Sequence, residues 1–147
     1  MTIEPNVFES VRSFTVAAQC LAKNLDLALR ACGSDFDQWR ILNLLVHRGE
    51  FTMGALAADA MLLAPRASKL VARLAESGLV ERRVDAGDRR KVVVYALPAS
   101  LPVLDEWNSS VAKVVEGYRR ALDSDTERFE AALGRLAQTF PSDACND

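Results

Sequence analysis

Apolar residues recur in steps of four and three along the first thirty residues of the chain. This spacing puts them on one side of a helix over about residues 6–31, because such steps follow the helical period. The positions are Val7, Val11, Phe14, Ala18, Leu21, Leu25 and Ala28. A stripe of more than three heptads favours packing against another helix over a simple surface stripe.

The C-terminal third repeats this rhythm twice. A fifth helix is predicted to end near Leu122, and a sixth helix follows it. Their apolar positions are Leu104, Trp107, Val111, Val114 and Tyr118, then Phe129, Leu133, Leu136 and Phe140. Ser100 is expected to cap the fifth helix, and Ser124 with Glu127 to form a capping box for the sixth. Residues 141–147 are expected to fray.

Shorter elements are predicted in the middle of the chain. Asp35, with Gln38 three residues on, is a capping-box-like start for a second, largely apolar helix that ends near Gly49. Phe51-Thr52 is expected to be extended, with Thr52 capping a third helix over about residues 53–61. The order so far is long helix, helix, short strand, helix.

A fourth helix over about residues 65–77 begins with Pro65 in its first turn and ends at Gly78. Its apolar face is Ala67, Leu70, Val71 and Leu74, and another face carries Arg66, Lys69 and Arg73. The residues before Pro65, Leu63-Ala64, offer no capping side chain, so we expect free backbone N–H groups there that a phosphate can satisfy.

Residues 80–84 and 91–97 read as two strands, since both are rich in valine. The charged segment between them, which contains Gly87, is expected to be the turn of a hairpin. Together these elements predict a mainly α fold with a small β wing (α+β): a winged helix-turn-helix domain flanked by N- and C-terminal helices whose apolar stripes favour packing against other helices.

Charge strengthens this interpretation only when it is mapped along the chain. The whole chain has a net charge of −2, but residues 64–91 carry eight basic and four acidic side chains. Phosphate attraction is local, because salt screens charges beyond about 8–10 Å. A basic patch on an acidic body can therefore bind DNA, although a solvated helix-and-loop surface is the alternative interpretation.

The winged layout assigns roles to this patch. The apolar face of the fourth helix anchors it to the body, and the opposite side can then enter a major groove with Arg66, Ser68, Lys69 and Arg73. The hairpin tip, Asp88-Arg89-Arg90, can reach an adjacent minor groove, where narrow segments attract arginine. We expect double-stranded DNA to be the partner.

Other function classes have little support in the residues. The three cysteines, Cys20, Cys32 and Cys145, include no Cys-x-x-Cys spacing, and His47 is the single histidine. We therefore expect no metal site, cofactor or disulfide framework. The chain has no nucleophile–base set, Gly-x-Ser-x-Gly motif or phosphate loop, so it is not expected to be an enzyme. The odd set of cysteines favours a reducing cytoplasm, and neither a signal peptide nor a membrane span is visible.

The central region resembles the MarR family of bacterial transcriptional regulators. The resemblance covers residues 35–97 and rests on QWRIL at 38–42, Thr52 leading into Leu56-Ala57, SKLVARLAESGLVER at 68–82 and DRR at 88–90. The LxxxGLVxR core of the third motif is shared with other winged-helix families, but its combination with Asp-Arg-Arg at this spacing is specific. The chain departs from the family at residues 97–100, where LPAS stands in place of a Leu-Thr-x-x-Gly pattern.

The resemblance implies a homodimer on a palindromic operator with half-sites about 10 bp apart. It divides the chain into a dimerisation helix (1–34), a winged domain (35–97), dimerisation helices (98–140) and a tail (141–147). By position, Arg66, Ser68 and Lys69 would be recognition-helix contacts, and Arg90 the minor-groove arginine with Arg89 beside it. Asp88 would pair with Arg73 and fix the wing, a turn cap being the alternative.

The resemblance also implies a repressor that leaves DNA on binding a small aromatic or phenolic acid or its thioester. Phe14, Trp39, Arg40 and His47 are the candidate ligand residues. Each has a plainer alternative: helix-packing core for Phe14 and Trp39, a surface ion pair for Arg40 (or Arg12), and a helix-end partner for His47. A redox-responsive regulator using Cys20, and a helical protein–protein dimerisation module without DNA binding, remain as alternatives.

Overall fold

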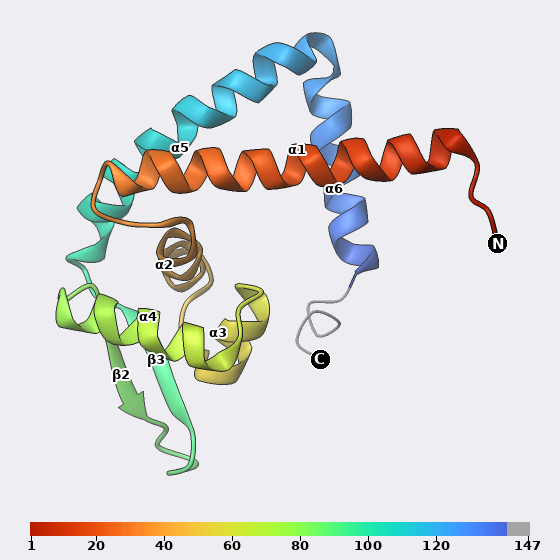
Figure 1. The fold of residues 1–147 in the computed structure, drawn as a ribbon. Helices are drawn as coiled ribbons and strands as arrows, with labels where there is room; N and C mark the ends of the chain where they lie inside the picture. Colours follow the sequence, from red (N-terminus) through yellow and green to blue (C-terminus); the bar gives the residue numbers. More distant parts are fainter. Residues whose placement is uncertain (141–147) are drawn as a thin grey trace.

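The computed structural model describes residues 1–140, so the expected tail and Cys145 lie outside the described residues. The first helix, α1 (Pro5–Arg30), begins with proline in its first turn, where the missing N–H costs nothing. In Figure 1, α1 crosses above the winged part of the chain (residues 36–96), and its N-terminal half extends past that part. Only its C-terminal half packs inward, through Leu25 and Leu29.

Helix α2 (Phe36–Arg48) begins as the sequence predicts. The Asp35 carboxylate accepts hydrogen bonds from the backbone N–H of Gln38 at 2.8 Å and from its side-chain amide at 3.0 Å. The buried side of α2 carries Ile41, Leu42 and Leu45, which places this helix at the centre of the fold.

Strand β1 (Phe51–Thr52) leads directly into α3 (Met53–Asp59), because the Thr52 hydroxyl accepts a hydrogen bond from Ala55 N–H and caps the helix. A turn then leads to α4 (Ala64–Glu76), which ends before Gly78 at φ 71°. That left-handed conformation strains any other residue type, so the glycine fixes the turn into the wing.

The sheet has three antiparallel strands in the order β1–β3–β2. Strands β2 (Val80–Val84) and β3 (Val92–Ala96) form the predicted hairpin, with Arg82 opposite Val94. Strand β1 pairs with the other edge of β3, Phe51 opposite Val94. The hairpin is long relative to the domain and projects away from α1 (Figure 1).

Two further helices follow within the described residues: α5 (Ser100–Leu122) and α6 (Thr126–Thr139), joined by the 3₁₀ turn η1 (Asp123–Asp125). The first half of α5 packs against α1 and α2 with Leu104, Trp107 and Val111 buried, and α6 contacts α5. One core therefore joins α1–α5, and the fold class expected from the sequence is confirmed.

Two predicted caps are wrong. Ser100 is the first residue of α5, not its cap, and its fully buried hydroxyl donates to Leu97 O at 2.6 Å. Ser124 lies within η1, and α6 begins at Thr126 without a side-chain cap. The hydroxyl of Thr126 instead donates to Asp123 O at 2.9 Å. At Ser100 a nearby backbone carbonyl therefore takes the hydroxyl that was expected to accept from an N–H.

Candidate nucleic-acid interface and adjoining depression

Helix α4 separates its apolar and basic residues onto different sides. Its buried residues are the predicted Ala67, Leu70, Val71 and Leu74. The predicted DNA-contact residues on this helix are all exposed: Arg66, Ser68, Lys69 and Arg73. Its N-terminus follows Leu63, which makes no side-chain capping bond, so the first-turn N–H groups face outward without a cap. This surface presents positive charge to a polyanion.

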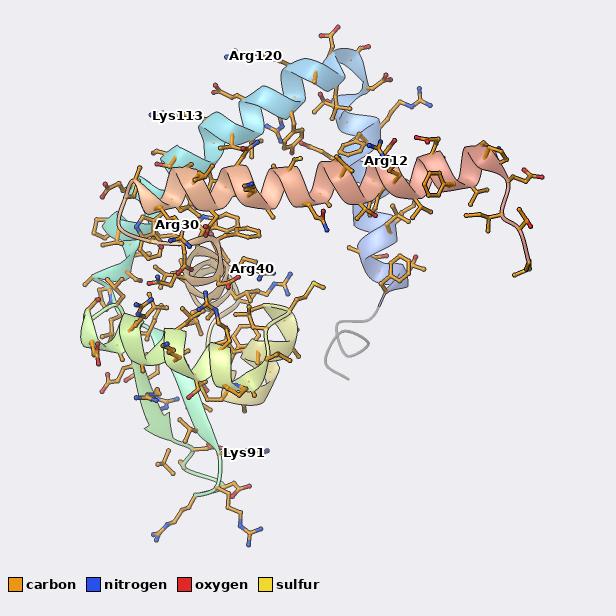
Figure 2. All side chains as sticks on the ribbon, viewed as in Figure 1. Arg12, Arg30, Arg40, Lys91, Lys113 and Arg120 are labelled. Carbon is orange, nitrogen blue, oxygen red and sulfur yellow. The ribbon has the colours of Figure 1, made fainter. Side chains whose placement is uncertain are left out.

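The tip of the hairpin carries the second group of exposed basic residues. Lys91 N–H donates to Asp88 O at 3.0 Å and Asp85 N–H donates to Lys91 O at 2.9 Å, which closes a tight turn. Arg89 and Arg90 lie on this turn and are exposed. Figure 2 labels Lys91 near the far end of the hairpin, well away from the body. The wing thus extends basic residues beyond α4.

The expected pairing of Asp88 with Arg73 is wrong. No ion pair joins them among residues 1–140; the Asp88 carboxylate instead accepts a hydrogen bond from the backbone N–H of Arg90 at 2.9 Å. This bond two residues along the chain is the turn-capping alternative. The wing is tied to the body elsewhere, by an ion pair of 2.5 Å between Arg83 and Glu50.

Arg66 is tied to the second helix. Its Nε and Nη2 both donate to Oδ2 of Asp37, at 3.2 and 3.0 Å. The other oxygen of Asp37 accepts from Arg40 Nη2 at 2.7 Å. Sequence reasoning missed Asp37, although its position three residues before Arg40 is a spacing that brings side chains together on a helix. One carboxylate therefore links α2 to the predicted recognition helix.

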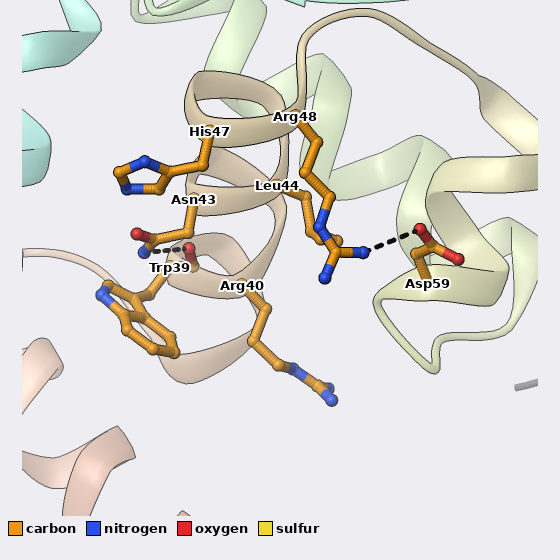
Figure 3. Close-up of a pocket in the computed structure, with 7 residues that line it drawn as sticks. All are labelled: Trp39, Arg40, Asn43, Leu44, His47, Arg48 and Asp59. Carbon is orange, nitrogen blue, oxygen red and sulfur yellow. Dashed lines mark hydrogen bonds and ion pairs between the residues drawn. The ribbon is translucent and has the colours of Figure 1, made fainter. Parts of the chain in front are cut away.

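A surface depression of about 340 Å³ lies along α2 and reaches α3 (Figure 3). Three of the four predicted ligand residues line it: Trp39, Arg40 and His47. The others lining it are Asn43, Leu44, Arg48 and Asp59. The sequence signal for Asn43 was its position midway between Trp39 and His47, at steps of four. Phe14 lies elsewhere, 55% exposed on the N-terminal half of α1.

The walls of this depression combine an aromatic ring with cations. Trp39 stacks on Phe36, with ring centroids 5.8 Å apart, and its indole N–H donates to Asn108 of α5 at 2.8 Å. The Arg40 guanidinium lies 4.8 Å from the centre of the Phe36 ring, and its Nε is buried without a hydrogen-bond partner. Arg48 reaches Asp59 at 3.5 Å (Figure 3). Such a site suits a planar anion.

Two carboxylates of the helical scaffold, those of Asp26 and Glu130, have a pKa below the ordinary value. The pKa of Asp26 is lowered, first by its hydrogen bond from Arg30 and then by the backbone N–H of Phe36. The pKa of Glu130 is lowered by hydrogen bonds from Arg119 and Tyr118. Both carboxylates connect consecutive helices through hydrogen bonds: Asp26 connects α1 to α2, and Glu130 connects α5 to α6.

Other expectations concern isolated residues. Cys20 is exposed as a free thiol on α1, and Cys32 is half-buried with its Sγ 3.0 Å from Ser110 Oγ. Within residues 1–140, no three or more histidine, cysteine, aspartate or glutamate side chains cluster to hold a metal ion. No helix in this range combines the length and apolar character that membrane crossing requires.

The fold and its exposed basic surface define a winged helix-turn-helix protein. Residues 33–91 match the model of the MarR family. The HTH-type transcriptional regulator FarR of Neisseria gonorrhoeae is 30% identical over 98 residues, which are 67% of this chain and 60% of FarR. The chain belongs to the MarR family.

Solved structures share the fold over nearly the whole chain. Sco3205, a MarR family regulator of Streptomyces coelicolor solved in complex with DNA, has a TM-score of 0.80 at 23% identity and covers 94% of this chain and 93% of its own. NadR in complex with 4-hydroxyphenylacetate has a TM-score of 0.71 at 23% identity, covering 92% and 94%. At these identities the likeness concerns the fold.

Proposed function

We propose that this protein is a sequence-specific DNA-binding transcriptional regulator. The observation that carries the proposal is the pairing of two exposed basic surfaces, on α4 and on the hairpin tip, held in one orientation by a shared core. A helix and a wing in this order fit a major groove and the adjacent minor groove. Lys69 and Arg73 face the major groove, and Arg89 with Arg90 face the minor groove.

A second copy of the chain is part of this proposal. The apolar stripe of α1 continues past the chain's own core, where Val7, Val11 and Phe14 are 45%, 60% and 55% exposed. On α6, Phe129 and Leu136 are also exposed. Large apolar side chains exposed along a helix in this way mark a protein interface. A homodimer that covers it presents two recognition helices to a palindromic operator.

The depression along α2 is the proposed effector site. Its tryptophan and arginine fit an aromatic ring and a carboxylate, and 4-hydroxyphenylacetate is the compound bound by NadR, a protein of the same fold. We therefore propose a ligand-responsive repressor that leaves its operator when a small aromatic acid binds. The ligand acts by favouring a conformation whose half-site spacing does not fit the operator.

Selection from random-sequence duplex DNA tests the DNA-binding proposal. The full chain should enrich one palindromic sequence, and its affinity for that duplex should fall steeply with salt, because bound phosphates release counterions. Lys69→Ala and Arg90→Ala should each weaken binding about tenfold or more and lower the salt slope by about one.

Matched controls use exposed cations far from α4 and the wing. Lys113→Ala and Arg120→Ala, both on α5 and labelled in Figure 2, should bind like the wild type. If Lys69→Ala and Arg90→Ala bind as tightly as these controls, or if selection enriches no sequence, the DNA-binding proposal is wrong. A dimer without operator binding would favour the protein–protein module instead.

A further inference from the structure

Asp37 stands between the depression and the recognition helix. Its Oδ1 accepts from Arg40, which lines the depression, and its Oδ2 accepts from Arg66 in the first turn of α4. The side chains of Asp37 and Arg40 keep 24% and 26% of their exposure, and that of Arg66 keeps 45%. Partial burial weakens screening by solvent, so one negative charge is shared between two cations at short range.

The contact folds the Arg66 guanidinium back onto the body. Two of its N–H groups point at a single oxygen of Asp37. Arg66 also lies beside the uncapped N-terminus of α4, where a DNA phosphate is expected to bind. A phosphate and Asp37 would therefore compete for the same positive charge. The strength of the Asp37 contact then determines how much of Arg66 is available to DNA.

Arg40 has donor capacity that Asp37 does not use. Its Nε is buried and lacks a partner, while the guanidinium remains at the wall of the depression. The Arg40 side chain as a whole keeps 26% of its exposure, so the rest of the guanidinium can be reached from the depression. A carboxylate there would pair with it and would share the positive charge of Arg40.

We propose that Asp37 is a positioning residue through which a carboxylate ligand controls the availability of Arg66. This inference rests on the proposed function. In the empty protein, Asp37 is divided between Arg40 and Arg66, and Arg66 exchanges readily onto a phosphate. When the ligand's carboxylate pairs with Arg40, the charge of Asp37 is balanced by Arg66 alone. Arg66 is then held more firmly against α2, and affinity for DNA falls.

The first test compares Asp37→Asn with Asp59→Asn. Both variants remove one negative charge, and Asp59 pairs with Arg48 at the same depression without an ion pair to α4. Binding to the selected operator duplex is measured by fluorescence anisotropy. Asp37→Asn should bind about threefold to fivefold tighter than Asp59→Asn, the effect of releasing one ion pair. The gain should disappear when Arg66→Ala is added to both.

The second test uses 4-hydroxyphenylacetate as the probe and tryptophan fluorescence as the binding readout, since Trp39 lines the depression. The probe should quench the wild type, Asp37→Asn and Asp59→Asn alike. It should weaken operator binding about fivefold or more in the wild type and Asp59→Asn, a usual allosteric coupling. In Asp37→Asn the weakening should be less than about twofold, because the link to Arg66 is gone.

The outcomes separate the two proposals. A wild type that binds no operator refutes the proposed function. A wild type that binds operator, with Asp37→Asn no tighter than Asp59→Asn or equally sensitive to the probe, overturns the role of Asp37 alone. A probe that leaves wild-type fluorescence unchanged contradicts the effector site and the ligand step through Arg40 together.

Discussion

The two halves of α1 carry the same apolar stripe and differ only in what covers it. In the C-terminal half, Leu25 is 6% exposed and Leu29 fully buried, because α2 and α5 pack there. In the N-terminal half, Val11 and Phe14 remain more than half exposed. Periodicity therefore identifies the face of a helix that will be covered, but it does not say whether the cover comes from the same chain.

The two halves of α1 are therefore expected to have different roles. The buried half fixes the winged domain to the helical scaffold, so its residues affect the stability of one chain. The exposed half would decide how many winged domains stand on one scaffold, so its residues affect assembly. The basic residues of α4 and the wing depend on both: on the first for orientation, and on the second for pairing.

The largest expected effect is on assembly. Phe14→Asp places a charge on the exposed half of the stripe, and burying it unpaired in a symmetric interface costs several kcal/mol at each of two copies. The variant should sediment as a monomer with its helical circular dichroism largely retained. Val16→Asp, 44% exposed on the opposite side of α1 before substitution, should still form the dimer. If the two variants sediment with the same mass, the apolar stripe of α1 does not mediate dimer assembly.

The next effect is on the shared core. Leu70→Ala empties a fully buried position on α4 and should lower the free energy of unfolding by about 2–5 kcal/mol in urea titration. Leu27→Ala, 60% exposed on α1, should change it by less than about 0.5 kcal/mol. Both are measured at one protein concentration, since association contributes to stability. A small change for Leu70→Ala would mean that α4 is not anchored by this face.

The smallest effect concerns the hydrogen bonds by which Tyr118 and Arg119 of α5 bind Glu130 of α6, which we call the α5–α6 joint. Glu130 accepts from Tyr118 at 2.9 Å and from Arg119 at 2.8 and 3.2 Å, which lowers its pKa in the folded protein. Its stabilising effect is therefore present above the ordinary glutamate pKa, about 4.3, and is lost as pH falls through the lower folded-state pKa.

Thermal melts measure this contribution through Glu130→Gln. The variant should melt slightly below the wild type at pH 7, and the difference should vanish at strongly acidic pH. Glu116→Gln is the control, because Glu116 meets Arg120 only at 3.7 Å and is 66% exposed. A Glu130→Gln difference that persists unchanged in acid would show that the carboxylate's charge is not what holds the joint.

Local patterns predicted most of the fold because they depend on neighbours in sequence. The buried face of α4 follows from helical spacing, and the Asp35 and Thr52 caps follow from short side chains before apolar runs. Ser100 and Ser124 failed as caps although the same residue preference applied, because the chain entered each helix through a different turn. The start of a helix depends on the preceding backbone path, which composition does not reveal.

Contacts between distant residues could not be predicted in this way. Asp37 and Arg66 meet because α2 and α4 pack against each other, and no periodicity relates positions 29 apart. The depression brought together Trp39, Arg40 and His47 because they share one side of α2, whereas Asp59 joined it because α3 packs against α2. Asp88 was predicted to pair with the distant Arg73, but its carboxylate accepts from the backbone N–H of Arg90, two residues along the chain.

A hydroxyl-radical footprint of the full chain on its selected operator tests the central claim most directly. If two winged domains stand on one helical scaffold, protection should appear as two equivalent patches about one helical turn apart, 10–10.5 bp between half-site centres. Arg90→Ala should lose the minor-groove part of both patches together. A single asymmetric patch, or no protection at concentrations where the dimer forms, would contradict the account.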